Sequence, residues 1–115
     1  MRKQVYSLLV ENNPGVTSRI SGLFSRRGYN IDSFSSGVTA DPRYTRITIV
    51  ATGDEQILEQ IEKQLNKKLD IIKVRTFKEE QSISRELMLM KVKYNRTNRK
   101  DIMEICDILK AEIVD

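Results

Sequence analysis

Residues 10–31 read VENNPGVTSRISGLFSRRGYNI and hold the end of one predicted strand, a whole predicted helix and the start of a second strand. Asn12 or Asn13 is a typical helix cap and Pro14 suits a first helical position, so we expect the helix to begin near Pro14. Gly28 is expected to end it, since glycine adopts the positive φ that closes many helices. Apolar side chains recur with the spacing of one helix face, at Val16, Ile20, Leu23 and Phe24.

The start of this helix is also a candidate binding site. Its first N–H groups have no partner inside the helix and carry partial positive charge. Gly15 leaves the backbone open to close approach, and Asn12 and Asn13 add amide donors and acceptors. A small carboxylate suits such a site. The alternative is an ordinary capped helix whose free amides face water, which on spacing alone is the commoner case.

Composition indicates a globular protein in the cytoplasm. Of the 115 residues, 39% are hydrophobic and 31% are charged. No apolar run approaches the roughly 18 residues of a membrane span, so we expect no membrane association. Residues 1–4 lead into a strand pattern and not into the apolar stretch of a signal peptide.

Residue content argues against an independent enzyme. The sequence has no histidine, which removes Ser-His-Asp and Cys-His nucleophiles and nearly all zinc sites. No phosphate-binding or dinucleotide-binding glycine motif occurs. Cys106 is the single cysteine, so no internal disulfide forms, and we expect it to be a small core residue. We expect no catalytic residue, metal or cofactor in this chain.

The order of the predicted elements defines an α+β fold. Strands are predicted at residues 4–10, 29–39, 44–52 and 69–77, and a second helix is expected after its cap, Asp54. This βαββαβ order with right-handed crossovers yields a four-stranded antiparallel sheet with two helices on one face, the ferredoxin-like arrangement. The polar, glycine-containing middle of 29–39 indicates an edge strand or a bulge.

After residue 83 the strand–helix–strand order begins again, but it is not completed. We expect a first domain at residues 1–78, a charged linker at 79–83 and the incomplete start of a second α+β domain at 84–115. Its parts are a strand at 86–93, a helix capped by Thr97 or Asn98, and a candidate strand from 111 to 115. So short a fragment hardly buries its own helix face alone. It is expected to pack on the first domain or on another subunit, or the chain is a shortened version of a longer protein, which is the interpretation we favour. Methionines 88, 90 and 103 are expected in the core.

Three segments carry a family resemblance. Residues 12–16 (NNPGV), 22–31 (GLFSRRGYNI) and 54–67 (DEQILEQIEKQLNK) resemble the small, regulatory subunit of bacterial acetolactate synthase, also called acetohydroxyacid synthase. The likeness is strong over residues 1–94 and looser beyond. It implies that the first domain is an ACT domain, an amino-acid-sensing module.

The resemblance also implies a function and partners. Small subunits of this family bind the catalytic large subunit, raise its activity and make it sensitive to feedback by valine, sometimes leucine or isoleucine. The catalytic subunit holds thiamine diphosphate, magnesium and FAD, and performs the shared early step of branched-chain amino-acid biosynthesis. The small subunit itself is non-catalytic and carries none of these cofactors.

The effector site of the family maps onto this sequence residue by residue. Asn12, Gly15, Ser18 and Asn30 match its asparagine, glycine, serine and second asparagine. The backbone amides near Gly15, together with Asn13, are expected to bind the effector carboxylate. Asn12 and Asn30 are expected to hydrogen-bond the polar end of the effector. Val16 and Ile31 are expected to line the side-chain pocket. Family ACT domains form homodimers through edge strands, with effector between subunits, which makes 29–39 the expected seam.

Two other functions compete. Net charge is +4, and the same strand order supports RNA-recognition domains that stack bases on sheet aromatics. Candidates for that role are Tyr6, Phe34 and Tyr44, with Arg43, Arg46 and Arg75. The spaced aromatic signature of those domains is absent, which ranks nucleic acid below an amino acid. The other competitor is an ACT-type sensor of a different amino acid for a different enzyme.

Overall fold

A computed structural model describes residues 1–114, and the chain divides into two compact units, Met1–Ser84 and Arg85–Asp115. In chain order the first unit contains β1 (Arg2–Glu11), α1 (Val16–Arg27), β2 (Ile31–Val38), β3 (Tyr44–Gly53), α2 (Glu55–Asn66), β4 (Ile71–Lys78) and the 3-10 turn η1 (Glu79–Gln81). The predicted βαββαβ order is confirmed. The turn η1 falls inside the stretch that sequence analysis treats as a linker.

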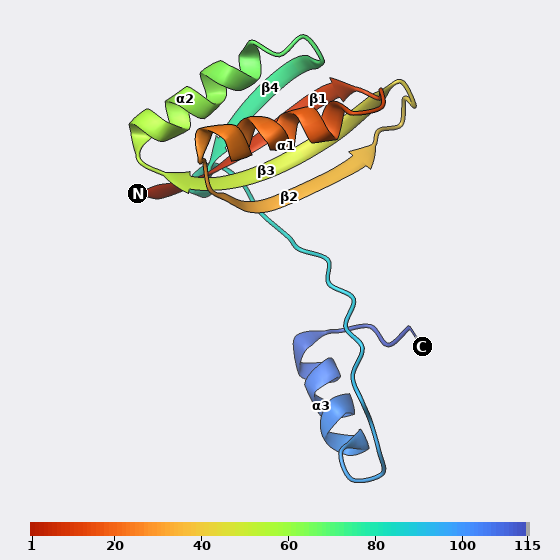
Figure 1. Ribbon diagram of the computed structural model, residues 1–115. Coiled ribbons are helices and arrows are strands. Elements are labelled where there is room, and N and C mark those ends of the chain that lie inside the picture. Colours follow the sequence, from red (N-terminus) through yellow and green to blue (C-terminus); the bar gives the residue numbers. More distant parts are fainter. Residues whose placement is uncertain (115) are drawn as a thin grey trace. The chain divides into compact units, whose positions relative to one another are not determined.

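One antiparallel sheet organises the first unit. Its strand order is β2-β3-β1-β4, with β1 in the centre. Figure 1 shows α1 and α2 together on one face of this sheet. β2 is an edge strand, and its register on β3 shifts between Ile31 and Ser33, so it is both the edge strand and the bulged strand that its polar sequence predicts.

The hydrophobic core lies between the helices and the sheet. Alternate residues of β1 enter it, and Tyr6, Leu8 and Val10 are each at most 1% exposed. The Tyr6 hydroxyl donates a 2.8 Å hydrogen bond to the Leu58 carbonyl of α2. Burial raises the pKa of Tyr6 to about 12, because ionisation would place a charge inside the core. Tyr6 therefore presents no ring for stacking on a nucleic acid base.

The two helices of the first unit begin differently. The α2 cap is as predicted: Asp54 Oδ1 accepts a 2.8 Å hydrogen bond from the Ile57 N–H. The predicted cap of α1 is wrong, because the helix begins at Val16, its N-cap is Gly15 with φ 83°, and no side chain caps it. A left-handed residue here turns the chain from β1 into the helix, a conformation that glycine adopts without strain. At the other end Gly28 closes α1 as predicted, with φ 67°.

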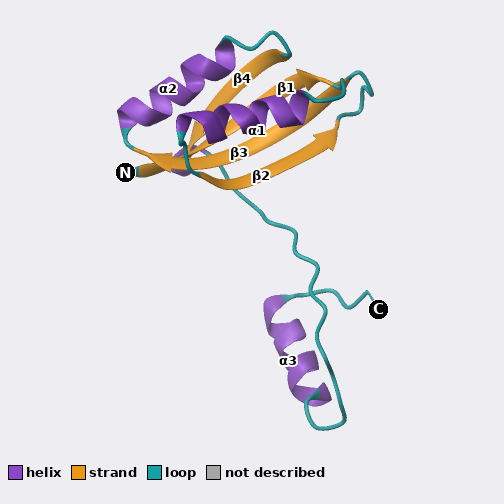
Figure 2. Cartoon of the chain, viewed as in Figure 1, coloured by secondary structure: helices purple, strands orange, loops and turns teal. Residues whose placement is uncertain are grey.

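The second unit contains one helix, α3 (Arg99–Leu109). The predicted strand at 86–93 is wrong: these residues form no strand (Figure 2). A strand needs a neighbour to complete its hydrogen bonds, and residues 85–114 offer none. Residues 111–114 form no strand either, and the last residue of that prediction lies outside the described residues. Asn98 occupies the N-cap position, but its side chain accepts from the Asn95 N–H at 2.7 Å and does not cap α3.

Burial in the second unit is slight. No residue between 85 and 114 is buried, and Cys106 is half-buried. The prediction that three methionines belong to a core is wrong for this chain, since Met88, Met90 and Met103 are 65%, 72% and 50% exposed. Among residues 1–114, no helix has the length and apolar character needed to cross a membrane.

Candidate functional site

Asn12 ties the turn after β1 to the turn between β2 and β3. Its Nδ2 donates to the Pro42 carbonyl at 3.0 Å, and its Oδ1 accepts from the Thr45 hydroxyl at 3.1 Å. Its backbone N–H donates to the Arg43 carbonyl at 2.9 Å. These hydrogen bonds fix the turn between β1 and α1. An amide oxygen accepts two hydrogen bonds and an amide nitrogen donates two, so each atom retains one further bond.

Gly15 and Arg19 together form the charged end of α1. A Cβ atom at Gly15 would lie 3.1 Å from Arg19 Nη1, so the absence of a side chain makes room for the guanidinium. Arg19 Nε and Nη2 each lie 2.8 Å from Asp70 Oδ2, just before β4. Half of the Arg19 side chain stays exposed. Arg19 Nη1 therefore lies beside the start of the helix. There the Val16 N–H donates to the Asn13 carbonyl at 3.4 Å, and the N–H groups that follow it in the first turn have no partner inside the helix.

The other predicted residues at this end divide between solvent and core. Asn13 is exposed and donates through Nδ2 to Glu11 Oε2 at 3.0 Å. Ser18 is exposed in the first turn of α1. Val16, expected to line an effector pocket, is only 3% exposed and packs into the core of its own chain.

Asn30 and Ile31 lie at the opposite end of α1. The helix has 12 residues, which at about 1.5 Å per residue separates its ends by roughly 18 Å. Asn30 is exposed, with Nδ2 3.3 Å from Asp32 Oδ1, and Ile31 is half-buried against the core. A single chain therefore does not bring Asn30 to Gly15. Asn30 instead borders a shallow hollow shared with Gly28, Tyr29, Ile57 and Gln60.

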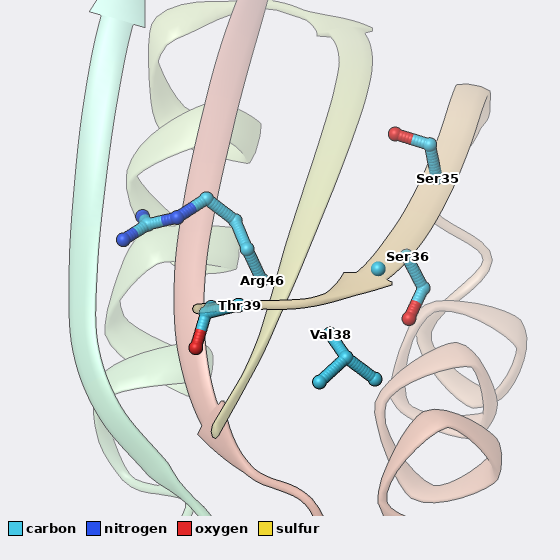
Figure 3. Close-up of a pocket in the computed structure, with 6 residues that line it drawn as sticks. Ser35, Ser36, Val38, Thr39 and Arg46 are labelled. Carbon is cyan, nitrogen blue, oxygen red and sulfur yellow. The ribbon is translucent and has the colours of Figure 1, made fainter. Parts of the chain in front are cut away.

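The end of β2 and the start of α1 lie at the same border of the sheet. Val38 pairs with Thr45 of β3, and Thr45 pairs with Val10 at the end of β1. Val38 is 62% exposed at this border. A shallow hollow lies here, lined by Ser35, Ser36, Gly37, Val38, Thr39 and Arg46 (Figure 3). The outer edge of β2 has no partner strand within residues 1–114.

A βαββαβ sandwich with an open β2 edge and a glycine-initiated α1 defines an ACT-type module. A family model described as the AHAS small subunit-like ACT domain matches residues 6–73. A second, described as the small subunit of acetolactate synthase, matches residues 85–115. The chain therefore belongs to the family of acetolactate synthase small subunits.

Individual relatives agree with this assignment. The acetolactate synthase small subunit of Haemophilus influenzae is 45% identical over 113 residues, 98% of this chain and 69% of that protein. The Mycolicibacterium smegmatis small subunit is 47% identical, over 95% of this chain and 64% of that protein. In a crystal structure of the Thermotoga maritima small subunit, the match has a TM-score of 0.83 and 30% identity, and covers all of this chain and 72% of that one. The chain thus spans about two thirds of the length of these relatives.

Arg19 and Asp70 are the residues that sequence analysis missed at the candidate site. Their ion pair joins positions 51 apart, so no local pattern reveals it. An arginine four residues after the N-cap glycine is the one available signal, because one helical turn places its side chain back over that glycine.

Proposed function

We propose that this chain is the regulatory subunit of an acetolactate synthase. It binds the catalytic large subunit in the cytoplasm, stimulates it and makes it sensitive to feedback by valine. Thiamine diphosphate, magnesium and FAD belong to the catalytic partner. Family membership supports the regulatory role. The observation that carries the effector site is the uncapped start of α1 at Gly15, where Arg19 Nη1 lies beside the glycine, at the same border of the sheet as the end of β2.

Valine is recognised first through its carboxylate. The free N–H groups of the first turn of α1 and the Arg19 guanidinium supply donors of matching charge. The helix dipole alone contributes about 0.3–1 kcal/mol, so the arginine and partial burial must supply the rest. Asn12 contributes the one donor and the one acceptor of its side-chain amide that do not bond to the β2–β3 turn.

Asn30 joins this site from a second protomer. When two β2 edges pair antiparallel about a two-fold axis, the start of one strand faces the end of the other. The end of β2 lies at the Gly15 border of the sheet, and Asn30 precedes β2. Pairing therefore carries Asn30 and Ile31 of each protomer toward Gly15 of its partner. Two equivalent effector sites result, each incomplete in a single chain.

Effector binding then regulates the catalytic partner by changing how the two protomers are placed relative to each other. Valine lying across the seam stabilises one placement of the paired ACT domains, and the catalytic partner responds to that placement. A coupling free energy of about 1–3 kcal/mol, typical of allosteric pairs, accounts for five- to 150-fold inhibition.

Thermal melting of the full chain with valine, leucine, isoleucine or glycine tests the effector class. A ligand that binds only the folded state raises the melting temperature in proportion to the logarithm of its concentration. We expect a rise with valine and none with glycine, which has the same carboxylate and amine but no side chain. Equal melting temperatures with all four amino acids would contradict the proposed effector. A rise with an amino acid outside this group would instead favour the sensor of another enzyme.

A further inference from the structure

The face of the sheet opposite the helices is uncovered within the first unit. α1 and α2 both lie on the other face (Figure 1), where Gln4, Tyr6, Leu8 and Val10 of β1 are buried. The intervening side chains of β1 and their register partners on β3 and β4 point the opposite way. This open face includes Lys3, Val5, Ser7, Leu9, Arg46, Thr48, Val50, Thr52, Lys73, Arg75 and Phe77, with Glu11 at the end of β1.

In the middle of this face the charged side chains are all positive, and the acidic ones lie toward its rim. Lys3, Arg46, Lys73 and Arg75, here called the basic face, are all exposed. Among residues 1–114 the ion pairs are Arg2–Glu55, Arg19–Asp70 and Arg43–Asp41, so none of these four cations is neutralised by an ion pair. The acidic residues adjoining the face stand at strand ends: Glu11, Asp32, Glu79 and Glu80.

Three of the four cations converge on the middle of β1. Arg46 reaches from β3 across β1 (Figure 3). Its Nη1 donates to the Ser7 hydroxyl at 2.7 Å. Arg75 of β4 is the register partner of Ser7, and Lys73 is that of Leu9. These side chains gather positive charge around the middle of β1, with no ion-paired carboxylate among them. An anionic partner would be attracted to this face.

The apolar part of the face favours a protein over RNA. Val5, Leu9, Val50 and Phe77 lie half-buried between the cations, as expected for a protein interface with a partly apolar centre. Base stacking requires exposed aromatic rings, but Tyr6 is buried on the other face, and Phe77 on this face is only half-exposed. Tyr44 lies at the strand end, with the Arg43 guanidinium 5.3 Å from its ring centre.

We propose that the basic face docks onto an acidic, partly apolar surface of the catalytic partner. This inference rests on the proposed function and deepens it, because it assigns the surface through which the regulatory subunit binds. The edge strand β2 stays free for a second protomer, so the effector seam and the docking face use different parts of one sheet. Regulation then passes from the seam to the partner through the sheet itself.

The test compares two double charge reversals in the full chain. Arg46→Glu with Arg75→Glu reverses the centre of the basic face. Lys63→Glu on α2 with Lys67→Glu at its C-cap reverses two exposed positions elsewhere by the same net charge. Binding to the purified catalytic subunit is measured by calorimetry at low and moderate salt. We expect the basic-face variant to bind at least tenfold more weakly with a flatter salt dependence, and the α2 variant to bind like the unchanged chain.

Each outcome decides one question. Unchanged binding by the basic-face variant overturns this inference, as does an equal loss in the α2 variant, which would indicate a net-charge effect. The valine-dependent melting shift reports folding separately, and Arg46→Gln with Arg75→Gln replaces the reversal if that variant does not fold. Failure of the unchanged chain to bind the catalytic subunit refutes the proposed function itself. Binding of a single-stranded RNA oligonucleotide through the same residues also overturns the assignment to an acidic protein.

Discussion

The two units of this chain use the same local order, an apolar segment followed by an amphipathic helix, with different outcomes. In the first unit, β1 lies between β3 and β4 and buries Tyr6, Leu8 and Val10. In the second, the apolar segment 86–93 remains unpaired, and Leu87 and Leu89 are 90% and 82% exposed.

The difference shows which elements depend on a partner. A helix satisfies most backbone hydrogen bonds within itself, so α3 forms even though it buries no residue. A strand satisfies its backbone only through a neighbour, so the pattern of 86–93 predicts a strand that this chain alone does not complete.

The largest expected difference is in amide hydrogen exchange between β1 and residues 87–93. The amides of Tyr6 and Leu8, in the central strand, should exchange through global unfolding, with protection on the order of 1,000-fold or more. The amides of residues 87–93 should exchange within about tenfold of the unprotected rate. Exchange followed by NMR measures both in one sample. Strong protection of 87–93 would show that this segment has found a strand partner.

Core truncation should be costly in the first unit alone. Leu58→Ala removes a side chain that is 1% exposed, and the cavity it leaves should lower the free energy of unfolding by about 2–5 kcal/mol. Ile105→Ala on α3, at a side chain 54% exposed, should change it by less than about 0.5 kcal/mol. Urea denaturation measures both. Similar costs for the two variants would break the contrast.

Alkaline pH should destabilise the first unit through Tyr6. Its pKa is raised to about 12 in the folded chain, whereas the unfolded tyrosine ionises near pH 10. Stability from the neutral phenol is therefore complete below pH 10 and is lost as pH rises toward 12, on the order of 2 kcal/mol in total. Tyr6→Phe should remove this part of the pH dependence, together with the hydrogen bond to the Leu58 carbonyl. An unchanged alkaline slope in that variant would contradict the burial of the ionising group.

The smallest expected effect concerns the helix caps. Asp54→Ala removes the bond to the Ile57 N–H and should cost about 1 kcal/mol in the unfolding of the first unit. Asn98→Ala occupies the matching position before α3, where the side chain makes no cap, and should leave that transition unchanged. Denaturation curves compare the two. Equal losses would show that the N-cap bond of α2 is not the source of the difference.

Sequence analysis recovered features that depend on local chemistry. The βαββαβ order, the Asp54 cap and the Gly28 terminator follow from periodicity and backbone preference. The edge position and bulge of β2 follow from its polar, glycine-containing centre. These signals are contained within a few residues, so no tertiary information is needed to interpret them.

Features set by distant contacts were not predictable in the same way. The asparagine expected to cap α1 instead bonds to Pro42 and Thr45, which only the folded sheet brings near. The Arg19–Asp70 ion pair likewise joins α1 to the start of β4. The separation of Gly15 from Asn30 depends on the length of α1, so a single chain keeps these two expected effector residues apart.

A mixed dimer tests the composite effector site most directly. Gly15→Asp places a carboxylate beside Arg19, and Asn30→Ala removes the amide supplied across the seam, so neither variant alone should bind valine in calorimetry. Random mixing of the two produces mixed dimers, each with one intact site, so the mixture should bind with near-normal affinity at about a quarter of the unmodified stoichiometry. If the mixture binds no valine although mixed dimers form, the half-sites do not combine across the seam, and the proposed site is wrong.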